Sequence, residues 1–153
     1  MNIKEEIIKI VTDMENQIGT EKMGDLFQKE STSSKDKKIG SNQFRDIASM
    51  CAKAESYAEI ELMIKYSIAK ANEGKSWKLK CSNNKIFGDI ILDSMNKVTK
   101  IDETKILENM ELFFGYLYWQ ARIWADRYSN DSNNNKNHNN RTPDKQNRHA
   151  NRS

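Results

Sequence analysis

A long amphipathic segment near the end of the chain constrains the fold more than any other feature of the sequence. Between Asp102 and Tyr128, apolar residues recur at steps of three and four. This spacing places them on one face of a single helix, which must be covered by other elements. The face consists of Ile106, Met110, Phe113, Phe114, Leu117, Ala121, Trp124 and Tyr128.

Four earlier segments also show helical periodicity, and no segment shows the alternation typical of a strand. They cover residues 3–18, 41–54, 57–71 and 86–98, and the segment 57–71 either extends the one before it or follows a short break near Ser56. Gly19 is placed to stop the first helix, Ser41 to cap the second and Asp102 to cap the last. The segment 57–71 is apolar on more than one face, which is typical of a central helix. The predicted fold class is all-α, a compact helical bundle of about five helices.

Composition divides the chain into a domain and a tail. Residues 1–128 form the predicted bundle domain, and within it residues 28–40 have no hydrophobic period and are predicted to be a mobile loop. Residues 129–153 include nine Asn and are predicted to be a disordered, low-complexity basic tail. The tail carries five basic and two acidic residues, so it accounts for the net charge of +3 of the whole chain. The domain itself is therefore neutral.

The sequence lacks the residue patterns of a catalytic site. The only histidines, His138 and His149, lie in the predicted tail, and no phosphate-binding or nucleophile motif is present. We therefore expect no enzyme activity, no metal site and no cofactor. Cys51 and Cys81 have no CxxC spacing and are typical of reduced thiols in a cytoplasmic protein. No stretch approaches the roughly 20 apolar residues that span a bilayer, so no membrane contact is expected.

A basic segment is embedded in the neutral domain. Residues 65–85 contain six lysines and one acidic residue, Glu73. Lysines spaced in this way can contact a sugar-phosphate backbone without reading bases, although an ordinary solvated surface is an equal alternative on composition alone. Arg45 has the same two interpretations, because it can contact a nucleic acid or pair with Asp46 or Glu61. Trp77 either stacks on a base or anchors the segment to the bundle, and the large area that Trp buries favours the anchor.

Two aromatic residues of the last helix, Tyr118 and Trp119, fall outside its main apolar stripe. Their position indicates a second buried surface, formed against another subunit.

Three short patterns, in the same order, resemble the small subunit of type III-A CRISPR effectors, the Csm-complex small subunit family. Residues 40–46 (GSNQFRD) are similar to the start of a helix in that family, with a hydroxyl, polar, apolar and arginine pattern. Residues 64–66 (IKY) through 74–75 (GK) resemble a helix with a basic residue that ends in glycine and a basic residue. Residues 110–116 (MELFFGY) resemble that family's run of methionine, glutamate, a small residue, two apolar residues, a small residue and tyrosine, with the bulky Leu112 at the first small position.

The resemblance implies a non-catalytic helical bundle within a ribonucleoprotein. Its copies are expected to associate head to tail, to contact other effector subunits, and to run along the guide RNA and target RNA without sequence specificity. By position, the resemblance implies RNA contacts at Arg45, Lys65 and Lys75, and the local charge adds Lys78 and Lys80. The rival hypothesis is a helical adaptor that binds only proteins.

Overall fold

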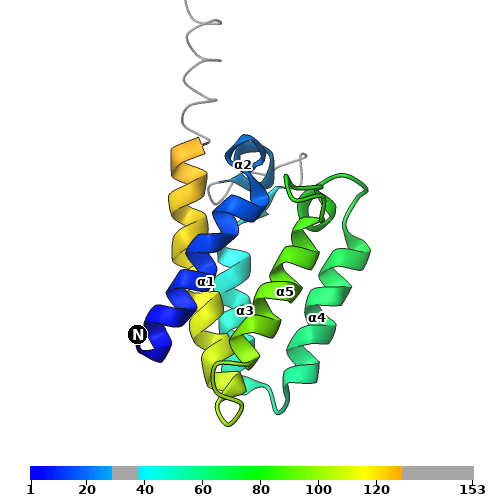
Figure 1. The fold of residues 1–153 in the computed structure, drawn as a ribbon. Helices are drawn as coiled ribbons and strands as arrows, with labels where there is room; N and C mark the ends of the chain where they lie inside the picture. Colours follow the sequence, from blue (N-terminus) through cyan, green and yellow to red (C-terminus); the bar gives the residue numbers. More distant parts are fainter. Residues whose placement is uncertain (29–37, 129–153) are drawn as a thin grey trace, which may run out of the picture.

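The computed structural model describes residues 1–28 and 38–128, so the predicted tail at 129–153 lies outside the described residues. The described chain is a helical bundle (Figure 1), which confirms the predicted all-α fold class. Two short strands, β1 (Phe27–Gln28) and β2 (Ile39–Gly40), and one 3-10 helix, η1 (Ser76–Lys78), accompany the α-helices. The α-helices are α1 (Ile3–Ile18), α2 (Thr20–Leu26), α3 (Asn42–Lys53), α4 (Tyr57–Lys70), α5 (Phe87–Thr99) and a C-terminal helix described over residues 106–128.

Helix α1 has the boundaries that its sequence predicts. The backbone N–H of Glu5 donates to the side-chain oxygen of Asn2 at 2.8 Å, which satisfies one of the free donors of the first turn. The helix ends at Gly19, whose φ of +89° is a conformation that L side chains rarely adopt. The chain turns there directly into α2, which the sequence pattern did not predict. The buried stripe of α1 consists of Ile7, Val11, Met14 and Ile18.

The two ends of the segment predicted to be a loop, residues 28–40, are paired strands. Phe27 pairs with Ile39 and Gln28 with Gly40, in parallel orientation. The Ile39 side chain is fully buried in the hydrophobic core. Both ends of the segment therefore belong to the packed domain, and residues 29–37 lie outside the described residues.

Helix α5 is central to the bundle, and α4 lies at its edge (Figure 1). α5 packs between α1 and α4 and buries seven of its residues. In α4 only Ile60 and Ile64 are buried, whereas Leu62 is 68% exposed and Tyr66 is 62% exposed. The prediction that residues 57–71 form a central helix is therefore wrong. Its additional apolar side chains face outward rather than toward a second layer of the bundle.

The C-terminal helix buries its predicted stripe but begins later than predicted. Its buried residues include Met110, Phe113, Leu117 and Trp124. The helix starts at residue 106, and the Asp102 carboxylate forms a turn with Thr104 instead of capping the helix. It accepts hydrogen bonds from the Thr104 hydroxyl at 2.6 Å and the Thr104 N–H at 3.0 Å, and these bonds lower the pKa of Asp102.

Trp124 connects the C-terminal helix to the other end of the sequence. Its indole N–H donates to Glu15 Oε1 in α1 at 2.7 Å, and its ring stacks on Phe27 at a centroid distance of 5.4 Å. Both Trp124 and Phe27 are buried, so this contact joins α1, β1 and the C-terminal helix in one core. None of the described helices is long and apolar enough to cross a membrane.

Candidate nucleic-acid interface

The segment between α4 and α5, residues 71–86, is here named the basic connection, and one buried residue anchors it. Trp77 in η1 is only 4% exposed. Its ring lies 5.5 Å from that of Phe87 and 6.1 Å from that of Phe44, in an edge-on arrangement with the latter. The anchoring interpretation of Trp77 is confirmed, because the indole is packed between α3 and α5.

Backbone hydrogen bonds hold the rest of the basic connection on the bundle. The Cys81 N–H donates to the Lys85 carbonyl at 2.8 Å, and the Phe87 N–H donates to the Leu79 carbonyl at 2.9 Å. The Ser82 N–H donates to the carbonyl of Ile18, the last residue of α1, at 3.0 Å. The lysines of the connection therefore project from a backbone that is fixed at several points.

Three of the six lysines between residues 65 and 85 have an acidic partner. Lys65 Nζ lies 3.8 Å from Glu61 Oε1, one turn earlier in α4. Lys85 Nζ lies 2.6 Å from Asp93 Oδ2, and this hydrogen bond raises the pKa of Lys85. The two pairs are at the surface, where ion pairs are weak and are screened by salt.

Lys78 is the most constrained of these lysines. Its ammonium group donates to the Ala69 carbonyl at 3.4 Å and lies 3.7 Å from Glu73 Oε1, and its side chain is only 24% exposed. A lysine that satisfies a free carbonyl at the C-terminal end of a helix stabilises that end. Lys78 therefore has a structural role at the end of α4, whatever else it contacts.

The remaining lysines, Lys70, Lys75 and Lys80, are exposed and have no acidic partner in the part of the chain that the structure describes. Lys70 Nζ lies 5.1 Å from the centroid of the Tyr66 ring, which is a cation–π contact rather than a neutralising pair. The positive charge of the basic segment is thus concentrated on these three side chains, at the end of α4 and along the basic connection.

A polar groove lies beside the end of α4, and Lys70 is one of its lining residues. It encloses about 370 Å³ between the start of α3, the end of α4 and η1. No carboxylate is among the described residues that line it. Ser76, on its wall, has a φ of +56°, which is a strained conformation for a residue other than glycine. The lining residues are Lys38, Gln43, Ser67, Lys70, Ala71, Asn72, Ser76 and Trp77.

Sequence patterns missed most of this groove. The available signals were the charge of Lys70, which belongs to the basic segment, and the position of Trp77 within that segment. Lys38 and Gln43 lie around the start of α3 and Ser67 lies near the end of α4, and nothing in their local pattern distinguishes them. Lys75 immediately precedes Ser76, which places its backbone at the rim of the groove. Among the residues predicted to contact RNA, Lys75 is therefore the one that lies next to the groove.

Arg45 lies apart from the groove. Gln43 lines the groove, and two residues along a helix correspond to a rotation of about 200°, so Arg45 points away from it. The Arg45 guanidinium carbon instead lies 5.8 Å from the centroid of the Tyr118 ring. A residue predicted to bind RNA and a residue predicted to form a subunit interface are thus in contact with each other.

The two predicted interface residues differ in exposure. Tyr118 is half-buried and packs against the core, whereas Trp119 is 63% exposed. The Trp119 ring lies 5.9 Å from that of Tyr116, and Ile123, one turn later, is 48% exposed. Trp119 and Ile123 therefore form an apolar strip on the outer side of the C-terminal helix.

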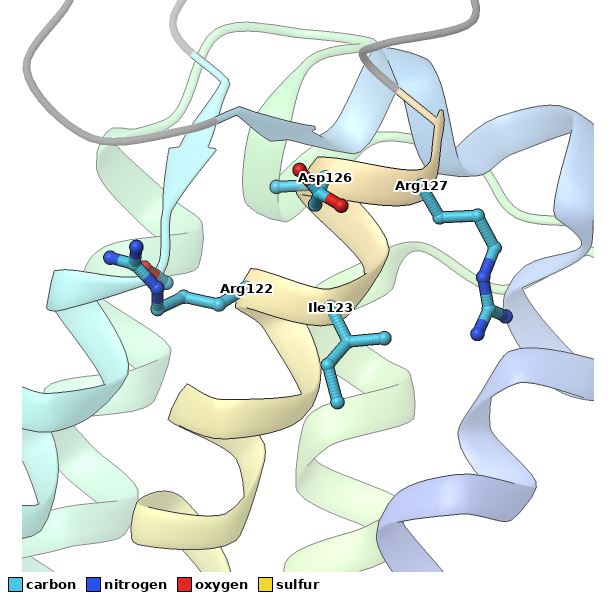
Figure 2. A pocket seen from close by; sticks show the side chains of 6 residues that line it. Arg122, Ile123, Asp126 and Arg127 are labelled. Carbon is cyan, nitrogen blue, oxygen red and sulfur yellow. The ribbon is translucent and has the colours of Figure 1, made fainter.

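A second hollow, of about 470 Å³, lies along the C-terminal helix and is lined by Ser41, Arg122, Ile123, Ala125, Asp126 and Arg127. Figure 2 shows that Arg122 extends toward the start of α3 and Arg127 toward α1, on opposite sides of the helix. Arg127 Nη1 lies 3.8 Å from Glu15 Oε1. The two guanidinium groups diverge, so they do not form one site for an anion.

The acidic residues and thiols of the described part of the chain do not form a metal centre. No three His, Cys, Asp or Glu side chains among them are arranged to hold a metal ion. Cys51 and Cys81 are free, buried thiols, and burial raises their pKa to about 12 and about 11. Both are thus protonated at neutral pH and are poor nucleophiles. The predicted tail histidines, His138 and His149, lie outside the described residues.

The chain matches no family model, no curated protein and no solved structure.

Proposed function

We propose that this chain is a non-catalytic small subunit of a cytoplasmic type III CRISPR ribonucleoprotein effector, in which it binds the backbone of guide and target RNA without sequence specificity. The observation that carries the RNA-binding part is the set of three exposed lysines without an acidic partner among the described residues, Lys70, Lys75 and Lys80. Lys70 lines a groove that has no carboxylate among its described lining residues, and Lys75 directly precedes another lining residue, Ser76. The assignment to this effector depends on the resemblance of residues 40–46, 64–75 and 110–116 to the small-subunit family.

The chemistry of the lysines favours backbone contacts over base recognition. An ammonium group is a compact point charge that contacts phosphate oxygens and releases counterions, and this interaction is independent of sequence. The charges are carried on a fixed connection, so several phosphates can be contacted at little additional cost in conformational entropy. Within this proposal Lys65 adds positive charge near the end of α4. Arg45 contacts RNA only on the side of α3 that faces away from the groove.

The apolar residues at the surface support the proposed association with other copies and other subunits. Leu62 and Tyr66 are exposed on α4, and Trp119 and Ile123 are exposed on the C-terminal helix. α4 and the C-terminal helix lie on opposite sides of the bundle (Figure 1). Two different apolar surfaces on opposite sides are what a head-to-tail association needs, because each copy then presents one surface to each neighbour.

The same apolar residues also favour the alternative, a helical adaptor whose partners are proteins only. In that case the lysines are a solvated surface. The adaptor predicts that complexes isolated with the chain contain no RNA and persist after nuclease treatment and in high salt. The RNA-binding subunit predicts that nuclease treatment or high salt removes at least part of the complex.

The direct test compares two sets of lysine substitutions in the full chain. The first replaces Lys70, Lys75 and Lys80 with Glu. The control replaces three exposed lysines at the other end of α5 with Glu, namely Lys97, Lys100 and Lys105. RNA affinity is measured by fluorescence anisotropy with single- and double-stranded RNA over a range of salt concentrations, and circular dichroism verifies the fold.

We expect the first variant to lose most of its affinity. Loss of three phosphate contacts lowers the slope of log K against log salt by about two units for single-stranded RNA. The control variant is expected to keep a slope close to that of the unmodified chain. Equal losses in the two variants would show that only net charge matters, and unchanged affinity in the first would refute the assignment of the site.

A further inference from the structure

The polar groove has features that contact with a duplex backbone does not require. Phosphates on the outside of a duplex can be reached by exposed lysines without any cavity. The groove, in contrast, is a recess of about 370 Å³, within the range of small-molecule sites, and six of the eight described residues that line it carry polar side chains. Two of its lining residues are cationic, Lys38 from the chain before β2 and Lys70 from α4.

The other polar lining residues are uncharged donors and acceptors. Gln43 and Asn72 carry amides, and Ser67 and Ser76 carry hydroxyls. Such groups suit the hydroxyls of a ribose, which both donate and accept hydrogen bonds. They come from α3, α4, the basic connection and η1, so they approach the groove from several sides.

An aromatic platform adjoins the groove. Tyr66 is 62% exposed, and its ring contacts the ammonium group of Lys70, which lines the groove. It also directly precedes Ser67, another lining residue. Exposed aromatic rings beside cationic grooves are what proteins use to stack the bases of single-stranded nucleic acids. A base-paired nucleotide cannot offer its face to such a ring.

From this arrangement we infer that the polar groove is a subsite for one unpaired ribonucleotide. Its phosphate lies between Lys38 and Lys70, its ribose hydroxyls contact the amide and hydroxyl side chains, and its base stacks on Tyr66. This inference rests on the proposed function, because it names the part of the RNA that the basic surface holds. It adds a preference for unpaired RNA, which backbone contacts alone do not produce.

Two measurements on the full chain test the subsite. Nuclear magnetic resonance of the isotopically labelled protein follows the amides of residues 66–77 and the Trp77 indole during titration with adenosine 5′-monophosphate, its 2′-deoxy analogue and inorganic phosphate. Anisotropy measures the affinity for a single-stranded RNA oligonucleotide and for the same strand in a duplex. The variants are Tyr66→Leu, which keeps an apolar side chain without an aromatic face, and Lys70→Ala. Lys100→Ala removes one charge at the other end of α5 as a control.

We expect adenosine 5′-monophosphate to shift these resonances at lower concentration than the deoxy analogue or phosphate. Single-stranded RNA should bind more tightly than the duplex. Tyr66→Leu should weaken single-strand binding about 5-fold or more, the effect of losing one base–aromatic stack. Lys70→Ala should weaken it and lower the salt slope by about 0.7, whereas Lys100→Ala should have no effect.

The inference is overturned if the duplex binds as tightly as the single strand, or if Tyr66→Leu and Lys70→Ala both bind like the unmodified chain. It is also overturned if the three small ligands give the same shifts at the same concentrations. If only the variant in which Lys70, Lys75 and Lys80 are all replaced by Glu loses RNA binding, the result supports the proposed function and contradicts the subsite. If the groove binds the nucleotide but the chain has no affinity for longer RNA, the result supports the subsite and contradicts the proposed function.

Discussion

Replacing Gly88 with alanine tests the packing of α4 and the basic connection against α5. Gly88 is buried, and a Cβ atom placed on it would lie 2.3 Å from Ile68 Cγ1 and 2.4 Å from Ile68 Cδ1. The same Cβ would lie 3.1 Å from the Trp77 carbonyl oxygen. Carbon atoms in favourable contact are about 3.5–4.0 Å apart, so Ile68 or the whole of α4 must move by about 1 Å.

The expected cost follows from these distances. Inserting a methyl group into a packed core costs about 1–3 kcal/mol. Replacing glycine by alanine inside a helix stabilises the folded state by about 0.5–1 kcal/mol. The gain is smaller here, because Gly88 is only the second residue of α5. We therefore expect Gly88→Ala to lower the free energy of unfolding by about 1–2 kcal/mol, which urea denaturation measures directly.

Gly115→Ala is a matched control on the C-terminal helix. No atom of the surrounding structure lies within 4 Å of its Cβ position. The same chemical change is therefore expected to raise the free energy of unfolding by about 0.5–1 kcal/mol. Opposite signs for the two substitutions would identify the close approach of α4 and α5, and not glycine itself, as the cause.

A double-mutant cycle with Ile68→Ala assigns the cost to its contact. Removing the outer carbons of Ile68 makes room for the new methyl group, so Gly88→Ala should cost little in that background. We expect a coupling energy of at least about 1 kcal/mol between the two positions. The reasoning is refuted if Gly88→Ala stabilises the protein as Gly115→Ala does, or if the effects of Gly88→Ala and Ile68→Ala are additive.

Further predictions concern the contact between α1 and the C-terminal helix and the two buried thiols. Glu15→Ala leaves the buried indole N–H of Trp124 without its acceptor and should cost about 1–3 kcal/mol in urea denaturation. Glu15→Gln keeps an acceptor oxygen and should cost less; equal costs would contradict the role of this bond. Because burial raises the pKa of Cys51 to about 12 and of Cys81 to about 11, a thiol reagent at pH 8 should label the native chain slowly and the urea-unfolded chain rapidly. A raised native pKa stabilises the protein below the pKa of about 8.5 of an unfolded thiol, so the free energy of unfolding should fall as the pH rises above that value, and a rise would contradict the burial of both thiols.

Apart from α2, the described α-helices were predictable because each has a local signal in the sequence. The apolar stripe of α1, from Ile7 to Ile18, and that of the C-terminal helix, from Met110 to Trp124, are buried as their spacing predicts. Such stripes need no knowledge of the partner helix, since burial of one face is enough to define them. The start of α3 after Ser41 was likewise predicted, although the Ser41 side chain makes no capping hydrogen bond.

The layering of the helices was less predictable. The sequence of α4 is apolar on two faces, and only the packed structure shows that Leu62 and Tyr66 remain outside. β1 and β2 are two residues each and pair across a gap in sequence, so neither has a periodic pattern. The contact between Glu15 and Trp124 joins residues 109 positions apart, which no local pattern can indicate.

In the candidate site, too, the sequence identifies the residues, whereas their partners depend on the tertiary structure. The sequence indicates six lysines in a neutral domain, but it does not rank them. The partner of Lys65 could be expected, since Glu61 precedes it by one helical turn. The partners of Lys78 and Lys85 depend on how the basic connection folds back on α4 and α5. The ranking of the lysines is therefore a tertiary property.

The contact between Arg45 and Tyr118 links the two functions proposed for the surface. An exposed cation–π contact contributes about 0.5–1 kcal/mol, so a phosphate can compete for the guanidinium group at modest cost. Release of Arg45 would uncover one face of the Tyr118 ring, beside the exposed Trp119. RNA contact at Arg45 and protein contact at Tyr118 would then favour each other, because the RNA breaks the contact that covers the ring. A substitution at Arg45 consequently cannot be interpreted as a loss of RNA affinity alone, whereas Lys70, Lys75 and Lys80 have no such connection to the C-terminal helix among the described contacts.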